Sequence, residues 1–254
     1  SDVCSSDLIS AFVAISRMPE RGQATLEICV DTPGDFDLAL AAGVDRIELC
    51  SALGLGGLTP TPGLIRHAAS SPVPVYAMIR PRAGNFCFSN SEVDVMMDEI
   101  QHVRDAGLAG VVLGASDGHG ALDEPVLSVL CQAAQGLGQT LHRVVDTITD
   151  PVTAVLTAQK LGFERILTSG GAPKAIEGQA VIGRMIETAS NDIEIMAGSG
   201  VLGAVVPDLW AVGVRSFHGS CSQVLDSNGT RAIDVQALAQ LQEAIRQAAR
   251  ASDH

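Results

Sequence analysis

The chain has 254 residues, 46% hydrophobic and 18% charged, with a formal net charge of −13. This composition is typical of a soluble globular protein and fits either one α/β barrel or two smaller domains. The acidic charge, the presence of only two lysines (Lys160 and Lys174) and a 3% aromatic content argue against nucleic-acid binding. No apolar run is long enough to predict a membrane span.

Residues 1–24 are predicted to lie outside the folded domain, which we expect to span residues 25–254. The first eight residues, SDVCSSDL, resemble the translation of a sequencing adaptor, and Met18 is the expected natural start. We therefore interpret this extension as foreign to the natural protein or disordered in part. The six cysteines form no C-x-x-C pair, which is typical of reduced thiols and predicts a cytoplasmic location.

Eight apolar runs alternate with helical patterns along the chain. Such repeated βα units predict a single (β/α)8 TIM-type barrel with parallel strands. A doubly wound open sheet is the alternative, but no G-x-G-x-x-G motif follows the first run. The runs cover residues 25–30, 46–50, 75–81, 110–115, 140–146, 165–170, 194–200 and 215–221.

Helix boundaries between these runs are also visible in the sequence. Ser89, three residues before Glu92, predicts a capping box, and Asp150 before Pro151 predicts another helix start. The last helix is expected over residues 235–251. Glycines are expected to end four of the helices in the left-handed conformation: Gly43, Gly107, Gly162 and Gly213.

The first two runs share the pattern carboxylate, aliphatic residue, cysteine, as Glu27-Ile28-Cys29 and Glu48-Leu49-Cys50. Because side chains alternate along a strand, Glu27 and Cys29 share one face, as do Glu48 and Cys50. In parallel barrels the active site lies where the strands end. Glu27 and Glu48 are therefore candidate catalytic carboxylates.

Two arginines, Arg80 and Arg82, follow the third run and suit an anionic ligand. The alternative is a structural ion pair between one of them and Glu27 or Glu48.

The fifth run adds His142, Arg143 and Asp146. His142 and Asp146 have the same strand parity and are candidate acid/base groups, with His142 also a possible metal ligand. The alternative is that His142 is an ordinary core residue. Arg143 joins Arg80 and Arg82 as a candidate substrate-binding group.

Glycine-rich turns follow the last runs. Gly198-Ser199-Gly200 at the end of the seventh run and His218-Gly219 at the end of the eighth lie where TIM barrels often hold phosphate, and Ser169 at the end of the sixth run offers another donor. These residues are predicted to bind an anionic group. Tight turns alone also require glycine, so the structural alternative stays open.

Thiol and thioether side chains suggest a second kind of site. Cys29, Cys50 and Met78, with His142, could all face the barrel interior, and such soft ligands favour Cu(I). Ordinary core packing is the alternative, because free cysteine and methionine are commonly buried.

The strings LEIC, DRIELC, GGLTPT, IRPRAGNFCFS, LHRVVD, RILTSG and IMAGSGV, in this order, resemble the CutC family of copper homeostasis proteins. The resemblance covers roughly residues 25–225 and implies a TIM-type barrel, a cytoplasmic location and a homo-oligomer. It also implies copper binding by cysteines, and the thiols in matching motifs are Cys29, Cys50 and Cys87. Ala83, Asn85 and Phe88 depart from the family's more usual PRGGDFCYS loop.

Two functions therefore follow from the sequence. The first is a cytoplasmic CutC-like protein of copper homeostasis that binds Cu(I) through Cys29 and Cys50. The alternative is a TIM-barrel enzyme that performs acid/base chemistry on a small anionic substrate, phosphorylated or sugar-like. The expected partners are a copper ion or such a metabolite, without nucleic acid or membrane.

Overall fold

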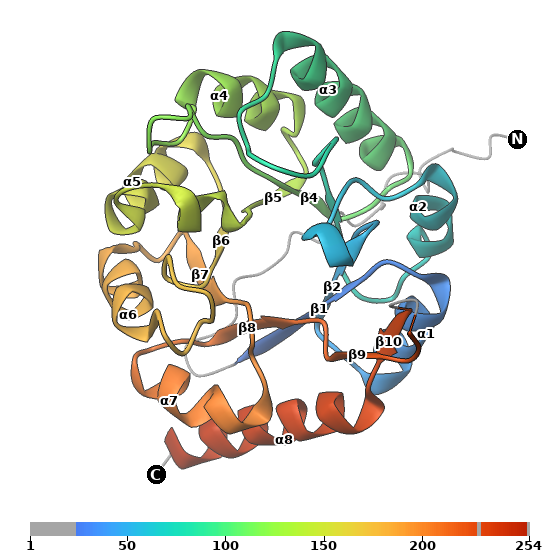
Figure 1. Cartoon of the computed structure of the whole chain (residues 1–254), viewed down its shortest axis with the longest axis vertical. Helices are drawn as coiled ribbons and strands as arrows, with labels where there is room; N and C mark the ends of the chain where they lie inside the picture. Colours follow the sequence, from blue (N-terminus) through green and yellow to red (C-terminus); the bar gives the residue numbers. More distant parts are fainter. Residues whose placement is uncertain (1–23, 228–229, 253–254) are drawn as a thin grey trace, which may run out of the picture.

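The computed structural model describes residues 24–227 and 230–252, so the predictions for residues 1–17 and Met18 lie outside the described residues. Within these ranges, eight parallel strands form a closed barrel in sequence order (Figure 1). The predicted single (β/α)8 barrel is confirmed. Its strands are β1 (Thr25–Val30), β2 (Arg46–Leu49), β3 (Val75–Met78), β4 (Gly110–Leu113), β5 (Gly138–Leu141), β6 (Arg165–Thr168), β7 (Glu194–Ala197) and β8 (Ser216–Gly219).

Helices surround the barrel on the outside (Figure 1). No helix within the described ranges has both the length and the apolar character needed to cross a bilayer. The helices are α1 (Pro33–Ala42), α2 (Pro62–Ala68), α3 (Asn90–Asp105), α4 (Glu124–Ala133), α5 (Pro151–Leu161), α6 (Gln179–Thr188), α7 (Val206–Ala211) and α8 (Val235–Ser252), with 3-10 turns η1 (Leu53–Leu55), η2 (Arg143–Thr147) and η3 (Gly203–Val205).

The predicted helix boundaries are present. Ser89 and Glu92 form the reciprocal capping box of α3, and Asp150 caps α5 ahead of its first proline. Gly43 and Gly162 end α1 and α5 with φ of 71° and 87°, and Gly107 and Gly213 also have positive φ. These local signals position the strands that follow them.

The fifth strand departs from its predicted range. β5 ends at Leu141, and the residues from Arg143 onward form η2 instead of continuing the strand to residue 146. The cause is local, because the ring nitrogen Nδ1 of His142 accepts a hydrogen bond from the backbone N–H of Val144 at 3.2 Å and caps the turn. The argument that His142 and Asp146 share a strand face is therefore wrong.

A buried polar layer fills the N-terminal end of the barrel. Arg46 and Arg165 lie over the ring of Tyr76, with their guanidinium carbons 5.8 Å and 5.0 Å from its centroid. Arg165 also donates from Nε to Glu194 at 2.7 Å. These ion-pair and cation–π contacts hold the layer together inside the barrel.

A hairpin between β8 and α8 was not predicted. Its strands, β9 (Ser222–Val224) and β10 (Arg231–Ile233), pair antiparallel, and β10 lies beside α1 (Figure 1). The buried carboxylate of Asp35 in α1 accepts a hydrogen bond from the backbone N–H of Ile233 at 2.9 Å. This contact anchors the hairpin next to the mouth of the barrel.

Candidate functional site

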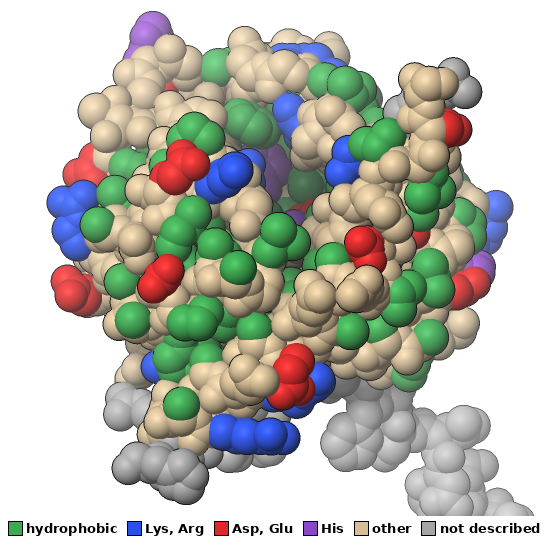
Figure 2. Space-filling view, turned by 60° about the horizontal axis from the view of Figure 1, so that its bottom comes forward, with side chains coloured by type: hydrophobic (Ala, Val, Ile, Leu, Met, Phe, Trp, Pro, Cys, Tyr) green, Lys and Arg blue, Asp and Glu red, His purple; other side chains and the backbone are tan. Residues whose placement is uncertain are grey.

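A cavity of about 1010 Å³ opens at the carboxyl ends of the strands. Figure 2 shows the hollow, with histidine side chains in its depth and basic side chains near its rim. Of the predicted site residues, those that line the cavity are Cys29, Glu48, Arg80, His142, Arg143, Asp146, Ser199, Gly200, His218 and Gly219. Those that do not line it are Glu27, Cys50, Arg82, Ser169 and Gly198.

Glu27 lies directly beneath the cavity floor and is fully buried. One carboxylate oxygen pairs with Nε of Arg46, and the other accepts from Nδ1 of His218 at 2.8 Å. Burial alone would raise the pKa of Glu27, but Arg46 and His218 hold it well below its usual value. Glu27 is therefore a carboxylate at neutral pH that orients His218 and does not line the cavity.

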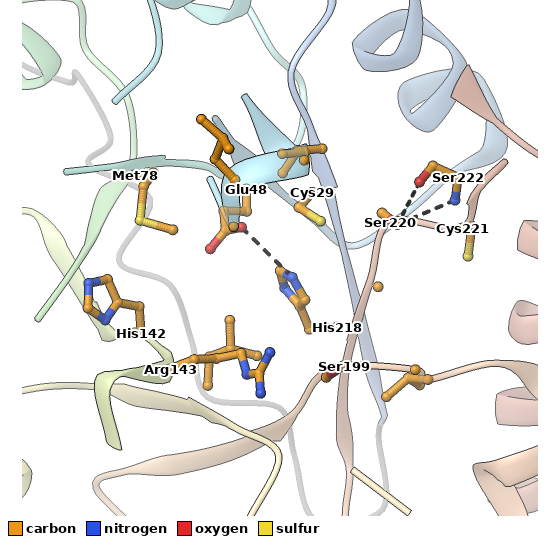
Figure 3. A pocket seen from close by; sticks show the side chains of 18 of the residues that line it. Cys29, Glu48, Met78, His142, Arg143, Ser199, His218, Ser220, Cys221 and Ser222 are labelled. Carbon is orange, nitrogen blue, oxygen red and sulfur yellow. Dashed lines mark hydrogen bonds and ion pairs between the residues drawn. The ribbon is translucent and has the colours of Figure 1, made fainter. Parts of the chain in front are cut away.

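Cys29, Glu48 and His218 form a compact group at the cavity floor (Figure 3). One donor atom from each lies within 4.8 Å of the other two, and Nε2 of His218 is 3.8 Å from a Glu48 oxygen. This arrangement follows from the strand register. Cys29 of β1 is paired with Glu48 of β2. Glu27 of β1 is paired with His218 of β8. Sequence reasoning placed His218 among the anion-binding residues and missed its place beside Cys29.

The electrostatics of this group favour a bound cation. Burial raises the pKa of the Cys29 thiol, although His218 partly opposes the shift. Burial also raises the pKa of Glu48, whose Oε1 has no hydrogen-bond partner among the described residues. Burial would lower the pKa of His218, but Cys29 and Glu48 raise it well above its usual value. A proton on His218 thus supplies the positive charge that a metal ion could provide instead.

Cys50 faces a different environment from Cys29. Its thiol donates to Oε2 of Glu48 at 3.4 Å and packs with Tyr76, Met78 and Val112 in a small buried cluster. Burial and the neighbouring Glu48 raise its pKa well above the usual value. The structure thus places the two predicted copper ligands on either side of Glu48 and brings only Cys29 into the three-donor group.

The arginines after β3 are held by the protein itself. Nη1 of Arg80 donates to the carbonyl oxygens of residues 55, 56 and 57, and its Nη2 donates to that of Gly84 at 3.0 Å. Arg82 pairs with Glu92 and donates to the carbonyl oxygen of Cys87 at 2.7 Å. Neither pairs with Glu27 or Glu48, so the alternative of an ion pair with those carboxylates is wrong. Both arginines instead organise the loops at the cavity rim.

His142 is a neutral, buried group at the side of the cavity. Burial and the positive charge of Arg80 lower its pKa to about 3, and its ring centroid lies 4.8 Å from that of Phe86. Since Nδ1 accepts the hydrogen bond from Val144, the neutral ring carries its proton on Nε2. His142 is 3% exposed, and Nε2 has no partner within the described part of the chain.

Asp146 is the centre of a hydrogen-bond network. It accepts from the hydroxyl and backbone N–H groups of Ser169, from the hydroxyl of Thr168 at 2.6 Å, and from the backbone N–H of Gly171. Arg143 adds a bond from Nε at 2.8 Å and reaches Ser169 with Nη2, also at 2.8 Å. The network fixes the Arg143 guanidinium at the cavity wall, on the far side of the cavity from Cys29 and Glu48 (Figure 3).

The predicted glycine-rich turn also reaches the cavity. Ser199 and Gly200 have φ of 76° and 68°, and the Ser199 hydroxyl donates to the carbonyl oxygen of Pro173 at 2.8 Å. A serine in the left-handed region carries backbone strain, which is common at functional sites. Sequence reasoning missed Cys221, Ser222 and Arg231, which line the cavity because the hairpin after β8 brings them there.

Known proteins match this chain over most of its length. The family model described as the CutC family matches residues 24–223. A CutC family protein of Rhizobium meliloti is 50% identical over 215 residues, which cover 83% of this chain and 86% of that protein. One of Caulobacter vibrioides is 51% identical over 196 residues, with 77% of this chain and 80% of that protein covered.

A solved structure gives the same assignment. The CutC crystal structure from Streptococcus agalactiae, named for copper homeostasis, is 31% identical with a TM-score of 0.74, and the match covers 78% of this chain and 99% of that one. Thiamine phosphate pyrophosphorylase from Pyrococcus furiosus, 15% identical with a TM-score of 0.58 over 90% of this chain and 98% of that chain, shares only the fold. The resemblance found in the sequence is confirmed, and the chain belongs to the CutC family.

Proposed function

We propose that this chain serves copper homeostasis by binding a copper ion at the cavity floor, through Cys29 together with Glu48 and His218. The observation that carries the proposal is the group of three donor atoms within 4.8 Å of one another. Sulfur, nitrogen and oxygen of this kind are common ligands of first-row transition metals. The unpartnered Oε1 of Glu48 offers a further site for a cation.

The surroundings of the three donors support a metal site. Glu27 accepts the Nδ1–H of His218, which leaves Nε2 toward Glu48 and Cys29. This carboxylate–histidine arrangement orients metal-ligating imidazoles in many proteins. The family name supports copper, and the five cysteines of the described ranges are all free thiols, which suits the proposed cytoplasmic location. A homo-oligomer stays a prediction.

Replacing Cys29 by serine is expected to weaken Cu(I) binding by about a hundredfold, because the hydroxyl does not supply a soft thiolate. Competition with a chromogenic Cu(I) chelator measures the affinity. Cys87→Ser is the matched control, since that half-buried thiol contacts Ser116 and does not line the cavity. We expect Cys50→Ser to have a small effect because a serine hydroxyl can still donate to Glu48. Equal affinities of Cys29→Ser and Cys87→Ser would refute the copper proposal.

A second function, acid/base catalysis on a small anionic metabolite, is favoured by the cavity itself. About 1010 Å³ is far more than an ion needs. Burial shifts the pKa values of two cavity residues in opposite directions. It raises the pKa of Glu48 and lowers that of His142 to about 3. Carboxyl and imidazole groups whose pKa values are moved apart by their surroundings are typical of acid/base sites, and the neutral His142 offers its Nε2–H as a hydrogen-bond donor.

Thermal-shift measurements with phosphorylated and carboxylate metabolites test this second function. A ligand at a hundred times its dissociation constant is expected to stabilise the chain by about 2.7 kcal/mol. NMR in deuterated water should then show exchange of a carbon-bound proton of that ligand, and Glu48→Gln should abolish the exchange while the ligand still binds. A ligand that binds without any exchange in the unmodified chain would contradict acid/base catalysis.

A further inference from the structure

The three metal-ligating groups occupy one side of the cavity floor. His218, Cys29 and Glu48 come from β8, β1 and β2, which are neighbours in the barrel. Transition-metal sites with three protein ligands keep a position open for water or substrate, whereas closed structural sites have four. Among the described residues, no fourth histidine, cysteine or carboxylate joins this group. The open position would therefore belong to a ligand in the cavity.

The charge of the donors indicates which ion and which ligand fit together. A Cys29 thiolate and a Glu48 carboxylate carry two negative charges, and a neutral His218 adds none. A divalent ion would make the group neutral, whereas Cu(I) would leave it negative and repel an anion. An anionic ligand is thus compatible with a divalent ion held at this place.

Arg143 supplies the second contact for such a ligand. Its guanidinium lines the cavity, its side chain is 40% exposed, and it lies across the cavity from Cys29 and Glu48 (Figure 3). Asp146 and Ser169 hold Nε and Nη2, so Nη1 stays outside that network. Arginine binds carboxylate and phosphate groups through such N–H donors. Arg80, in contrast, already gives Nη1 and Nη2 to backbone carbonyls.

We infer that a small oxyanion, a carboxylate or a phosphate, occupies the cavity between Arg143 and a divalent metal ion held by Cys29, Glu48 and His218. The inference rests on the proposed metal site, occupied by a divalent ion in place of Cu(I), and adds the class of its second ligand. It also unites the two proposed functions, because the cavity is then the binding site of the anion and its floor is the binding site of the metal.

Cobalt(II) is the probe for this site, because its absorption spectrum reports thiolate ligation and coordination number. Titration of the full chain with Co²⁺ is expected to give a sulfur-to-metal band that Cys29→Ser abolishes, which tests the metal site by itself. Inorganic phosphate and malonate are then added separately to the loaded chain. At least one is expected to shift the ligand-field bands saturably while the thiolate band persists, and the two arms distinguish phosphate from carboxylate ligands.

Arg143→Gln is expected to weaken the anion's effect by about tenfold, with an unchanged Co²⁺ affinity. Arg246→Gln is the matched control, because this exposed arginine of α8 pairs with Glu243 and does not line the cavity. Arg143→Lys retains the charge and is expected to lose less than the glutamine variant. A normal cobalt site whose spectrum neither anion alters overturns the inference and leaves the metal site standing. Loss of the cobalt site itself would instead refute the metal proposal.

Discussion

Replacing Arg46 by methionine is expected to destabilise the fold by about 3–5 kcal/mol, because it leaves the buried Glu27 carboxylate without its main partner. Glu27 is fully buried and its neighbour Arg46 is 6% exposed. Glu27 would keep only the contact with His218, and its pKa would rise toward the value that burial favours. Urea unfolding at neutral pH measures the free-energy change.

Arg246→Met is the matched control for this prediction. Arg246 pairs with Glu243 on α8, but both side chains are about half-exposed, and such surface pairs contribute at most about 1 kcal/mol. The double variant Glu27→Leu, Arg46→Met removes both charges and is expected to recover part of the loss. A cost for Arg46→Met as small as that of the control would show that the buried pair does not stabilise the barrel.

The contributions of Glu27 and His218 to the stability of the fold should depend on pH in opposite ways. The pKa of Glu27 is lower in the folded chain than in the unfolded chain, where it is about 4.3. Glu27 therefore stabilises the fold above about pH 4.3, and this stabilisation is lost as the pH falls from there toward the folded pKa. His218 has the opposite sign, since its pKa is raised by the fold. His218 therefore stabilises the fold fully below about pH 6.5, its pKa in the unfolded chain. This stabilisation is lost as the pH rises through the pKa of His218 in the folded chain.

The sequence predicts well what depends on neighbouring residues. Alternation in residues 25–30 and 46–50 is sufficient to place Glu27 with Cys29, and Glu48 with Cys50, on the inner face of the barrel. Glycine and proline signals locate the helix ends for a similar reason, because a positive φ or a missing N–H acts on its own residue. The repetition of such units then indicates eight strands and the end of the barrel where ligands bind.

What depends on the stagger between strands could not be predicted. The pairing of Glu27 with Arg46, and of Cys29 with Glu48, follows from the register of β1 against β2. Closure of the barrel then brings His218 of β8 beside them. No local pattern contains this register, so Arg46 was not expected as a partner of Glu27, and His218 was not expected beside Cys29.

Backbone groups explain the other differences. Arg80 and Arg82 looked available for a ligand, yet loop carbonyl oxygens and Glu92 take up most of their donors. The loop that provides these oxygens is irregular, and its course is set by packing over long distances in the sequence. The hairpin of β9 and β10 could not be predicted for another reason. Its strands have three residues each, which is too short to show an alternating pattern of apolar and polar residues.

The second large effect concerns His142, which should make the fold sensitive to mild acid. The unfolded chain binds a proton on this ring below about pH 6.5, but the folded chain does so only below about 3, because burial and Arg80 disfavour the charged form. The unfolded state therefore gains stability between these two values as the pH falls. At pH 4.5, two units below the unfolded pKa, this linkage removes about 2.7 kcal/mol of stability.

His142→Asn should remove this acid sensitivity while retaining the local structure. The asparagine oxygen can occupy the position of Nδ1 and accept the hydrogen bond from Val144, but the side chain does not titrate. Unfolding free energies of the two proteins, measured by urea at pH 7.5 and 4.5, give the difference directly, and contributions from Glu27 and His218 cancel in the comparison. The variant is expected to lose about 2.7 kcal/mol less than the unmodified chain over this range. Equal losses would mean that the folded chain accommodates a protonated ring, and would refute the neutral state of His142 beside the cavity.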